Sequence, residues 1–275
     1  MNSPNLTLTG VPETMLWTLH NRAVDALRPD RWIEDEHAVR IYRSIPYDYA
    51  KNFGTPDGSH AIRSVMFDEA VHQWLGNHPD GTVIELACGL ETQFHRVDNG
   101  QVQWVCIDLP DALAVRERFL PPSERCRHIA RSALDLSWMD EVASDRPAFI
   151  SMQGLLMYFE EKDVKTLLIA LLRHYPNCTV MFDTIPRWFS RKTLKGFWKT
   201  PHYKAPPMPW GVNRNEILPL LDAWGIEVHF FREEPFRKFR VFPWGLAPWI
   251  ARTPLLKRHM PVVVQLQGAP GPSQP

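Results

Sequence analysis

Small and acidic residues follow the apolar segments in the middle of this chain, and their types suit the binding of a nucleoside. The run Glu85-Leu-Ala-Cys-Gly-Leu-Glu-Thr92 contains Ala87 and Gly89, which are small enough to let a ligand approach the backbone. Asp108 ends the next apolar segment about 20 residues further on, where a carboxylate can accept hydrogen bonds from two ribose hydroxyls. The pair Asp135-Leu136 follows a third segment and is expected to meet an adenine edge.

The small-residue turn favours one class of cofactor over another. A pyrophosphate requires the full G-x-G-x-x-G pattern at the start of a helix. Residues 87–92 read A-C-G-L-E-T, so the third glycine is missing and the carboxylate of Glu91 would face the phosphates. A nucleoside that carries a cationic sulfonium and an amino acid suits this turn better. The residues therefore predict S-adenosylmethionine as the cofactor.

A sheet must position these residues, and the pattern of the chain predicts one. Short apolar runs alternate with stretches of helical spacing, which is typical of βαβ units and a parallel sheet. Ligands of such sheets bind beyond the carboxyl ends of the strands. Strands are expected at 82–86, 102–109, 128–133, 148–152, 178–183 and 226–231, with a seventh at 239–242. Helices are expected at 13–28, 35–42, 60–75, 111–120, 162–175 and 213–224, and a loop at 43–59.

The composition is that of a globular protein. The 275 residues can bury a large core without disulfides or a structural metal. Lys and Arg together number 31, as do Asp and Glu, so the chain lacks the basic excess that nucleic-acid binding requires. It contains no run of 18 apolar residues and no signal-peptide pattern at its start. We expect a soluble cytoplasmic protein with neither a nucleic acid nor a membrane as partner.

The cysteines and histidines show no sequence pattern of a metal site. None of the four cysteines (Cys88, Cys106, Cys126 and Cys178) is paired at C-x-x-C spacing. The eleven histidines have no repeated ligand spacing with acids. We therefore expect reduced, mostly buried cysteines and no metal.

Three regions stand apart from the alternation of strands and helices. Residues 1–78 are expected to form an N-terminal helical cap or lid on a cofactor-binding domain at 79–265. Within that domain, residues 187–212 are rich in Trp, Phe and Pro and are expected to form an aromatic insertion that serves as a lid or as the wall of an acceptor pocket. The Pro- and Gly-rich tail at 266–275 is expected to be disordered.

Four ordered motifs carry a family resemblance: VIELACGLETQFHRV, CIDLP, SALDLSW and QGLLMYF. From about residue 63 to residue 183 the chain resembles the leucine carboxyl methyltransferase family, in particular its bacterial branch of tetracenomycin-type polyketide O-methyltransferases. The resemblance implies an α/β fold of the class I methyltransferase type, with a Rossmann-like, mostly parallel seven-stranded sheet and helices on both faces. It also implies methyl transfer from S-adenosylmethionine to a carboxylate or hydroxyl of a small, aromatic or polyketide-like molecule.

The resemblance also assigns roles to residues. Arg63 matches an arginine near the cofactor carboxylate, and Asp108 matches the acid that binds the ribose. Ala87 replaces the first glycine of the family's small-residue loop, and Gln153 replaces a glutamate that contacts the cofactor amino group. The expected cofactor-binding residues are Arg63, Glu85, Ala87, Gly89, Asp108, Leu109, Asp135, Leu136 and Gln153.

The sequence fixes no catalytic residue. An ionised carboxylate acceptor needs no general base, whereas a hydroxyl acceptor needs one. The candidates for such a role are Tyr158, His202, Tyr203 and His95. Two alternatives stay open: a nicotinamide-dependent oxidoreductase, against which the incomplete glycine pattern argues, and a non-catalytic nucleoside-binding module, which Ala87 and Gln153 would suit. The acceptor's identity and the oligomeric state also stay open.

Overall fold

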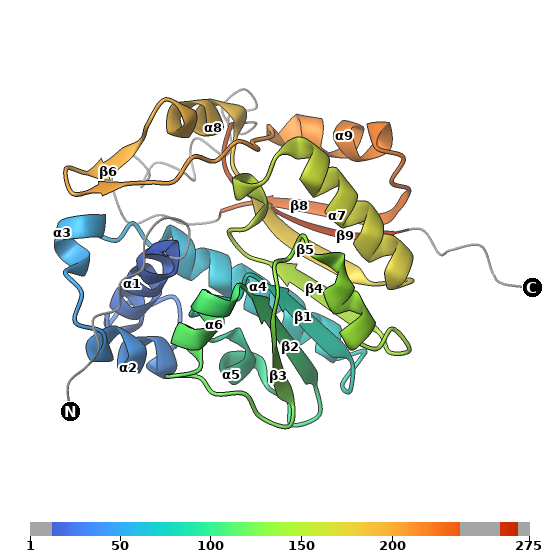
Figure 1. The fold of residues 1–275 in the computed structure, drawn as a ribbon, viewed down its shortest axis with the longest axis horizontal. Coiled ribbons are helices and arrows are strands. Elements are labelled where there is room, and N and C mark those ends of the chain that lie inside the picture. Colours follow the sequence, from blue (N-terminus) through green and yellow to red (C-terminus); the bar gives the residue numbers. More distant parts are fainter. Residues whose placement is uncertain (1–12, 237–258, 269–275) are drawn as a thin grey trace, which may run out of the picture.

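A seven-stranded sheet forms the centre of the protein in the computed structural model, which describes residues 13–236 and 259–268 (Figure 1). Its order is β3-β2-β1-β4-β5-β9-β8. The first five strands of that order run parallel, and β9 is antiparallel to both of its neighbours. The bounds are β1 (Thr82–Leu86), β2 (Gln103–Asp108), β3 (Cys126–Ala130), β4 (Ala148–Met152), β5 (Thr179–Thr184), β8 (Val228–Pro235) and β9 (Val262–Gly268).

The central strands are buried on both faces, which explains their continuous apolar sequences. Every residue of β1, β4 and β5 is buried, as is typical of a parallel sheet covered on both sides. The strand order reverses direction at β1, which lies between β2 and β4. A crevice for a ligand is expected where the order reverses, at the carboxyl ends of these strands.

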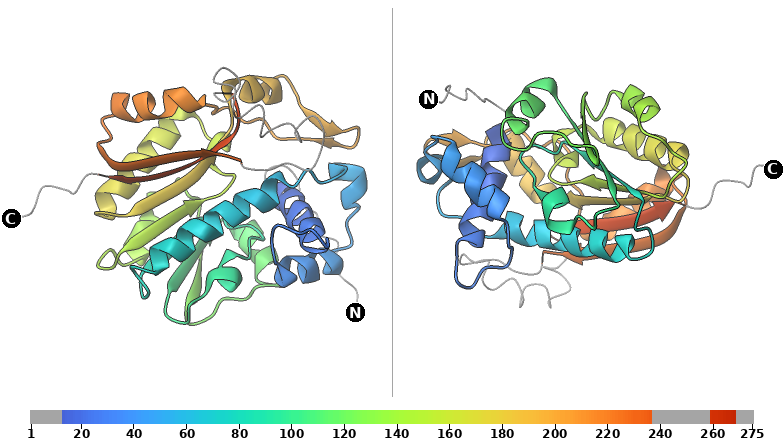
Figure 2. Two further views of the ribbon diagram at one scale, coloured as in Figure 1. Left: turned by 180° about the vertical axis from the view of Figure 1, so that it is seen from behind. Right: turned by 90° about the horizontal axis from the view of Figure 1, so that it is seen from below.

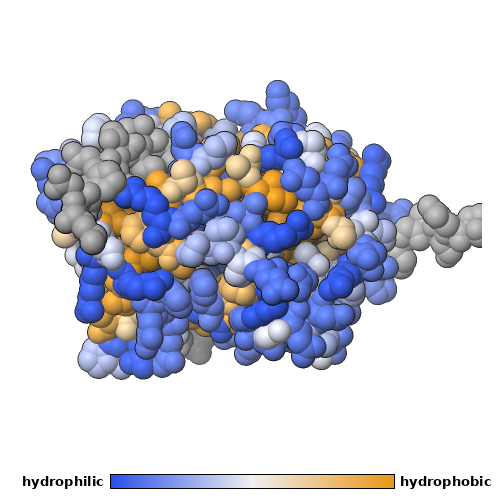
Figure 3. Space-filling model, turned by 60° about the horizontal axis from the view of Figure 1, so that its bottom comes forward, coloured by the Kyte–Doolittle hydropathy of each residue, from blue (hydrophilic) through white to orange (hydrophobic). Residues whose placement is uncertain are grey.

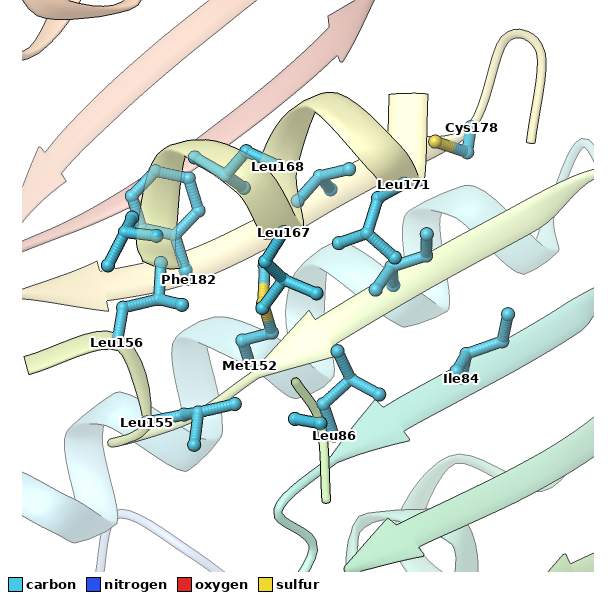
Figure 4. Packing of buried hydrophobic residues seen from close by; sticks show 14 of the residues in the cluster. Ile84, Leu86, Met152, Leu155, Leu156, Leu167, Leu168, Leu171, Cys178 and Phe182 are labelled. Atoms are coloured by element: carbon cyan, nitrogen blue, oxygen red, sulfur yellow. The ribbon is translucent and has the colours of Figure 1, made fainter. Parts of the chain in front are cut away.

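Helices cover both faces of the sheet, so the expected fold class is confirmed (Figure 2). One face is covered by α4 (Ser59–Leu75) and α5 (Gln93–Val97), and the other by α7 (Glu161–His174) and α9 (Ile217–Ala223). Acidic residues begin α7 and basic residues end it, as the helix dipole favours. Figure 4 shows three leucines of α7 lying over the strands, and the residues of this contact include Leu167, Leu168, Leu171, Met152 and Phe182.

The N-terminal helices form a separate apolar cluster beside the sheet. They are α1 (Thr14–Ala26), α2 (Glu36–Ser44) and α3 (Tyr49–Phe53). Asp35 caps α2 by accepting a hydrogen bond from the backbone N–H of Ala38. Helix α6 (Pro110–Arg116) follows β2 and contributes Ala112 and Val115 to this cluster.

The aromatic stretch after β5 is more regular than its sequence suggests. It contains α8 (Arg187–Leu194) and a two-stranded ribbon of β6 (Trp198–Thr200) and β7 (Tyr203–Lys204). The ribbon contacts α3 and contributes Tyr203 to the N-terminal cluster. Three short 3-10 helices complete the described elements: η2 (Leu136–Glu141), η3 (Leu156–Tyr158) and η4 (Arg214–Glu216).

Several sequence predictions need correction. The expected loop at 43–59 contains helix α3, because the carboxylate of Asp48 caps it through the N–H of Lys51. The expected disordered tail at 266–275 begins too early, because residues 266–268 are paired in β9 between β5 and β8. The expected strand at 239–242 lies outside the described residues. The seventh strand of the sheet is β9, which lies between β5 and β8.

The face of the molecule in Figure 3 is mostly polar and shows an apolar band between polar residues. Within the described ranges, no helix is long and apolar enough to cross a membrane.

Candidate functional site

A cavity of about 390 Å³ lies at the carboxyl ends of β1, β2, β4 and β5. Its polar part is formed by the residues that follow these strands. Its other walls come from α1, from the start of α4 and from α8 with the ribbon that follows it. The cavity therefore joins the strand ends to the N-terminal helices and to the aromatic stretch.

The structure brings most of the sequence-predicted residues to this cavity. Those that line it are Arg63, Glu85, Ala87, Gly89, Asp108, Leu109, Gln153 and Tyr158. Those that lie outside the lining formed by the described residues are Asp135, Leu136, His95, His202 and Tyr203.

The residues outside the cavity have other surroundings. Asp135 is exposed and caps η2 by accepting hydrogen bonds from Ser137, and Leu136 packs against the core under α7. His95 stacks on His37 with ring centroids 4.2 Å apart.

The two predicted site residues of the β6–β7 ribbon also lie outside the cavity lining. His202 is exposed in the turn between β6 and β7. Tyr203 is buried against the rings of Trp17 and Phe53. Neither is placed to touch a ligand in the cavity as the structure describes it.

The turn after β1 is left-handed at two positions. Ala87 has φ of 55° and Gly89 has φ of 44°, a region that glycine adopts freely and alanine adopts at a cost of about 1–2 kcal/mol. Arg116, which is buried, donates to the carbonyl oxygens of Gly89 (3.0 Å) and Glu91 (2.6 Å). A Cβ at Gly89 would lie 3.2 Å from the Cβ of Met15. The glycine thus allows α1 to approach the turn closely.

The carboxylate of Asp108 is held in a fixed orientation at the end of β2. Its Oδ2 accepts from the N–H of Gly89 (2.7 Å), and its Oδ1 accepts from the N–H of Leu109 (2.8 Å). Burial raises the pKa of Asp108 above its usual value, and these two hydrogen bonds offset only part of that rise. Each carboxylate oxygen keeps a second lone pair for a donor in the cavity.

Arg63 of α4 is fixed at the ends of β4 and β5. Its Nη1 lies 3.2 Å from Oδ2 of Asp183, whose Oδ1 accepts from the N–H of Gly154 at 2.6 Å. Gly154 has φ of +64°, and a Cβ there would lie 2.7 Å from Nη1 of Arg63. The buried Nε of Arg63 has no hydrogen-bond partner in the part of the chain that the structure describes.

The side-chain amide of Gln153 forms hydrogen bonds with residues of α4 and α5. Its Oε1 accepts from Ser64 Oγ at 3.5 Å, and its Nε2 donates to Gln93 Oε1 at 3.4 Å. Ser64 Oγ also lies 3.0 Å from Oε2 of Glu91. The side chain therefore has polar neighbours inside the protein in addition to its place on the cavity wall.

Two arginines bind the carboxylate of Glu91, a residue that also lines the cavity. Arg22 Nη1 lies 3.1 Å from Oε2, and Arg96 Nη2 lies 2.9 Å from Oε1. Burial alone would raise the pKa of Glu91, but Arg22 and Arg96 lower it to about 2. Asp35 and Asp68 complete this buried network. These arginines were missed because the sequence offers no spacing that pairs them with Glu91.

Glu85 is the next-to-last residue of β1 and lies beside the turn. Its Oε2 accepts from Trp104 Nε1 at 3.1 Å, whereas its buried Oε1 has no partner among the described residues. Burial raises the pKa of this carboxyl well above its usual range.

The part of the cavity away from the strand ends is aromatic and was missed by the sequence analysis. It contains Trp17 of α1, Phe189 of α8 and Phe197. Lys199 Nζ lies 5.4 Å from the ring centroid of Trp17, and Lys192 Nζ lies 4.6 Å from that of Phe197. An aromatic wall with ammonium groups suits a flat molecule that carries an oxygen function.

His60 is the histidine that lines the cavity among the described residues. Its ring meets Trp17 edge-on at 5.4 Å, and its Nδ1 is buried with no partner in the described ranges. Burial, followed by the charge of Arg63, lowers the pKa of His60 to about 3. The sequence signal that points to His60 is its spacing from Arg63. The two residues are three positions apart on the same helix, so their side chains lie on the same side of it.

Tyr158 lines the cavity as a neutral phenol. Burial raises its pKa to about 12, although a hydrogen bond with Thr14 acts in the opposite direction. A phenol with this pKa stays protonated at neutral pH, so Tyr158 can donate a hydrogen bond but does not serve as a base.

Comparison with known proteins identifies the family. The leucine carboxyl methyltransferase family model matches residues 16–171. The chain is 37% identical over 191 residues to the tetracenomycin polyketide synthesis O-methyltransferase TcmP of Streptomyces glaucescens, across 67% of this chain and 69% of TcmP. It is 29% identical over 195 residues to the S-adenosyl-L-methionine-dependent methyltransferase dpfgK of Gibberella zeae, across 64% of this chain and 65% of dpfgK.

Solved structures agree on the fold. The CurJ carbon methyltransferase superposes with a TM-score of 0.52 at 12% identity, across 94% of this chain and 68% of that one. A methyltransferase from Anabaena variabilis gives 0.50 at 15% identity, across 86% and 93%. Neither the oxidoreductase nor the non-catalytic alternative finds support in these matches. The chain belongs to the leucine carboxyl methyltransferase family and is an S-adenosylmethionine-dependent methyltransferase.

Proposed function

We propose that this enzyme methylates an oxygen of a small aromatic molecule, and that the oxygen is a hydroxyl. The observation that carries the proposal is that a single cavity joins the ends of β1 and β2 to an aromatic wall containing an uncharged histidine. The name of the relative TcmP, a polyketide O-methyltransferase, supports the same class of acceptor.

The residues at the strand ends fit S-adenosylmethionine. Asp108 would accept hydrogen bonds from the ribose, and the backbone of Ala87 and Gly89 would allow the cofactor to approach closely. The buried Nε of Arg63 suits the cofactor carboxylate, because it lacks a partner among the described residues. The buried Oε1 of Glu85, also without a partner there, suits a donor group. Asp135 and Leu136 are not part of the proposed set, since they lie away from the cavity.

The protein's main contribution would be alignment. When bound, S-adenosylmethionine supplies a methyl group already activated by a sulfonium. Trp17 and Phe189, on two different helices, would hold the ring of the acceptor so that its oxygen stands in line with that methyl group. Alignment of two reactants can contribute about 7–11 kcal/mol to lowering a barrier.

A hydroxyl acceptor must lose its proton during the transfer, and His60 is our candidate to accept the hydrogen bond of that hydroxyl and orient it. Because the pKa of His60 is lowered to about 3, its imidazole is uncharged at neutral pH and serves as a hydrogen-bond acceptor rather than as a strong base. Its Nδ1 is buried, so Nε2 is the nitrogen that would face the acceptor. Lys199, which lies near the ring of Trp17, would stabilise the developing phenolate.

Methyl transfer from labelled S-adenosylmethionine to matched phenols and aromatic carboxylic acids tests the proposal. We expect product from phenols, and a lower kcat for His60→Gln, which changes the hydrogen-bond acceptor that orients the hydroxyl. His202→Gln, on an exposed turn, is the matched control and should leave the rate unchanged. Methylation of carboxylic acids alone, at a rate that His60→Gln does not change, would establish a carboxyl methyltransferase instead.

A further inference from the structure

Three buried side chains from neighbouring strands bring together atoms that bind soft metals. The sulfurs of Cys106 on β2 and Cys126 on β3 and a ring nitrogen of His128 on β3 all lie within 4.8 Å of one another. The two sulfurs are 3.9 Å apart. Cys106 is 0% exposed, Cys126 is 5% exposed and the His128 side chain is 3% exposed. The cluster lies on the α4 face of the sheet, outside the lining of the methyl-transfer cavity.

His128 has the hydrogen bonding of a metal ligand. Its Nδ1 lies 3.1 Å from Oε1 of Glu117, a carboxylate that accepts an N–H. The proton on Nδ1 leaves Nε2 bare, and that atom is buried with no partner in the part of the chain that is described. Histidines that bind metals commonly donate their other N–H to a carboxylate, which fixes the tautomer.

The surroundings of Cys106 suit a metal-bound thiolate. Arg116 Nη2 donates to its sulfur at 3.4 Å, as outer donors do to coordinated thiolates. Glu85 Oε2 lies 3.7 Å from the same sulfur, so a carboxylate and thiols share one buried site. A metal bound to Cys106 would therefore have Arg116 and Glu85 as its outer neighbours.

The geometry favours a metal over a disulfide. In the register of β2 and β3, Cys106 faces His128 and Trp104 faces Cys126. Cys106 and Cys126 are therefore diagonal neighbours, whose Cα atoms are about 7–8 Å apart on adjacent strands, beyond the usual disulfide span of about 4.4–6.8 Å. Two sulfurs bound tetrahedrally at about 2.3 Å from zinc are about 3.8 Å apart, which matches the observed 3.9 Å.

Three protein donors are thus brought together on neighbouring strands. We propose that Cys106, Cys126 and His128 are three ligands of a structural zinc site. Structural zinc is almost always four-coordinate, so a further donor must approach this group. Cys88, which is buried in the turn after β1 and also lines the cavity, is the candidate for that position. Zinc there would join β2 to β3 beside the turn that lies against the cofactor site.

The metal content of the full chain is the direct test. We expect about one zinc ion per chain by inductively coupled plasma mass spectrometry when the protein is produced with zinc in the medium. After removal of the metal, Co²⁺ should bind and give a thiolate-to-cobalt charge-transfer absorption. Zinc affinity should also decrease as the pH falls, because the coordinating thiols must lose their protons.

Two variants and a control identify the ligands. Cys126→Ser should lower the charge-transfer absorption per bound Co²⁺, because one thiolate ligand is lost, whereas Cys178→Ser should leave it unchanged, because Cys178 is equally buried but packs in the core on the α7 face. Glu117→Gln changes an exposed residue and should lower zinc affinity by about 10–100-fold, even if Cys126→Ser fails to fold. A metal-free chain whose apo form takes up no Co²⁺ would overturn the proposal, as would a charge-transfer absorption that Cys126→Ser leaves unchanged together with a zinc affinity that Glu117→Gln leaves unchanged.

Discussion

Arg22 of α1 and Glu91 of the loop after β1 form a buried ion pair, with Nη1 3.1 Å from Oε2. Arg22 Nη2 also donates to the carbonyl oxygen of Leu90 at 2.7 Å. The same helix contributes Trp17 to the cavity wall, and the same loop contains Gly89. The pair therefore holds the N-terminal helix against the turn proposed to bind the cofactor.

Arg22→Met should destabilise the protein and weaken cofactor binding. Breaking a buried ion pair costs about 3–5 kcal/mol, and the loss should fall toward the lower figure because Arg96 still binds Glu91. Urea unfolding measures the stability and calorimetry measures the affinity for S-adenosylmethionine. Arg28→Met removes an exposed pair with Asp30 and is the control. If the two substitutions reduced stability and cofactor affinity equally, the buried pair would contribute no more than the exposed one.

Asp108→Ala should remove most of the affinity for S-adenosylmethionine. Two charge-assisted hydrogen bonds at about 1.5–3 kcal/mol each would be lost, which is on the order of a hundredfold or more in Kd. Some stability should be lost as well, because the N–H of Gly89 loses its acceptor. Asp135→Ala, at an exposed site outside the cavity lining of the described residues, should bind the cofactor normally. A larger loss of cofactor affinity in Asp135→Ala than in Asp108→Ala would contradict the assignment of Asp108 to the ribose.

Gln153→Glu tests whether the family's usual glutamate is tolerated here. The sequence alone predicts tighter cofactor binding, whereas the structure predicts lower stability. A carboxylate cannot donate to Gln93, and Ser64 would bridge it to Glu91. We expect a loss of about 1–3 kcal/mol in the free energy of unfolding, with no gain in affinity. Gln101→Glu at an exposed site is the control. An affinity gain of about fivefold without loss of stability would support a direct contact with the cofactor amino group.

Gly154→Ala should displace Arg63 from the cavity. The glycine has positive φ, and the new Cβ would lie 2.7 Å from Nη1 of Arg63. Gly225→Ala is a matched control, because Gly225 has φ of +74° and nothing lies within 4 Å of its Cβ position. Both variants should lose about 1–2 kcal/mol of stability through backbone strain. Weaker cofactor binding is expected for Gly154→Ala alone, and equal affinities in the two variants would argue against the role of Arg63.

The stability of the protein should decrease as the pH falls from about 7 to 4, in part through His95. Burial, together with the charge of His37, lowers the pKa of His95 to about 4. The unfolded chain, with a histidine pKa near 6.5, binds the proton first, so protonation favours unfolding in this interval. His95→Gln should reduce the slope of the unfolding free energy against pH, measured in urea between pH 7.5 and pH 4.5. His202→Gln should leave the slope as in the natural chain. Identical slopes for His95→Gln and the natural chain would contradict the prediction.

Local pattern was sufficient for the central strands and for part of the site. The predicted limits of β1 and β4 agree with the structure, because continuous apolar runs bounded by turn residues are typical of buried parallel strands. Asp108 and Gly89 could be assigned to one site because the carboxyl ends of adjacent parallel strands meet at the same edge of a sheet. The direction and spacing of the strands were enough for that inference.

Local pattern failed where a long-range partner decides the structure. Residues 266–268 read as a tail because of the Gly and Pro that follow, but pairing with β5 and β8 makes them a strand. Asp108 ends β2, whereas Asp135 lies beyond the end of β3, where its carboxylate caps η2 and stays exposed. Of the histidines, His60 reaches the cavity because of how α4 lies against α1, a packing that no spacing within the chain reveals.

The cysteines show most clearly what the sequence determines and what only the tertiary structure decides. The sequence determines the type of fold, the strand ends that bear polar residues, and the family, because these depend on local periodicity and on ordered motifs. It contains no C-x-x-C pair, so it gave no reason to expect a metal. The register of β2 against β3 brings Cys106, Cys126 and His128 within 4.8 Å of one another. Such contacts depend on strand order and register, and only the tertiary structure decides these.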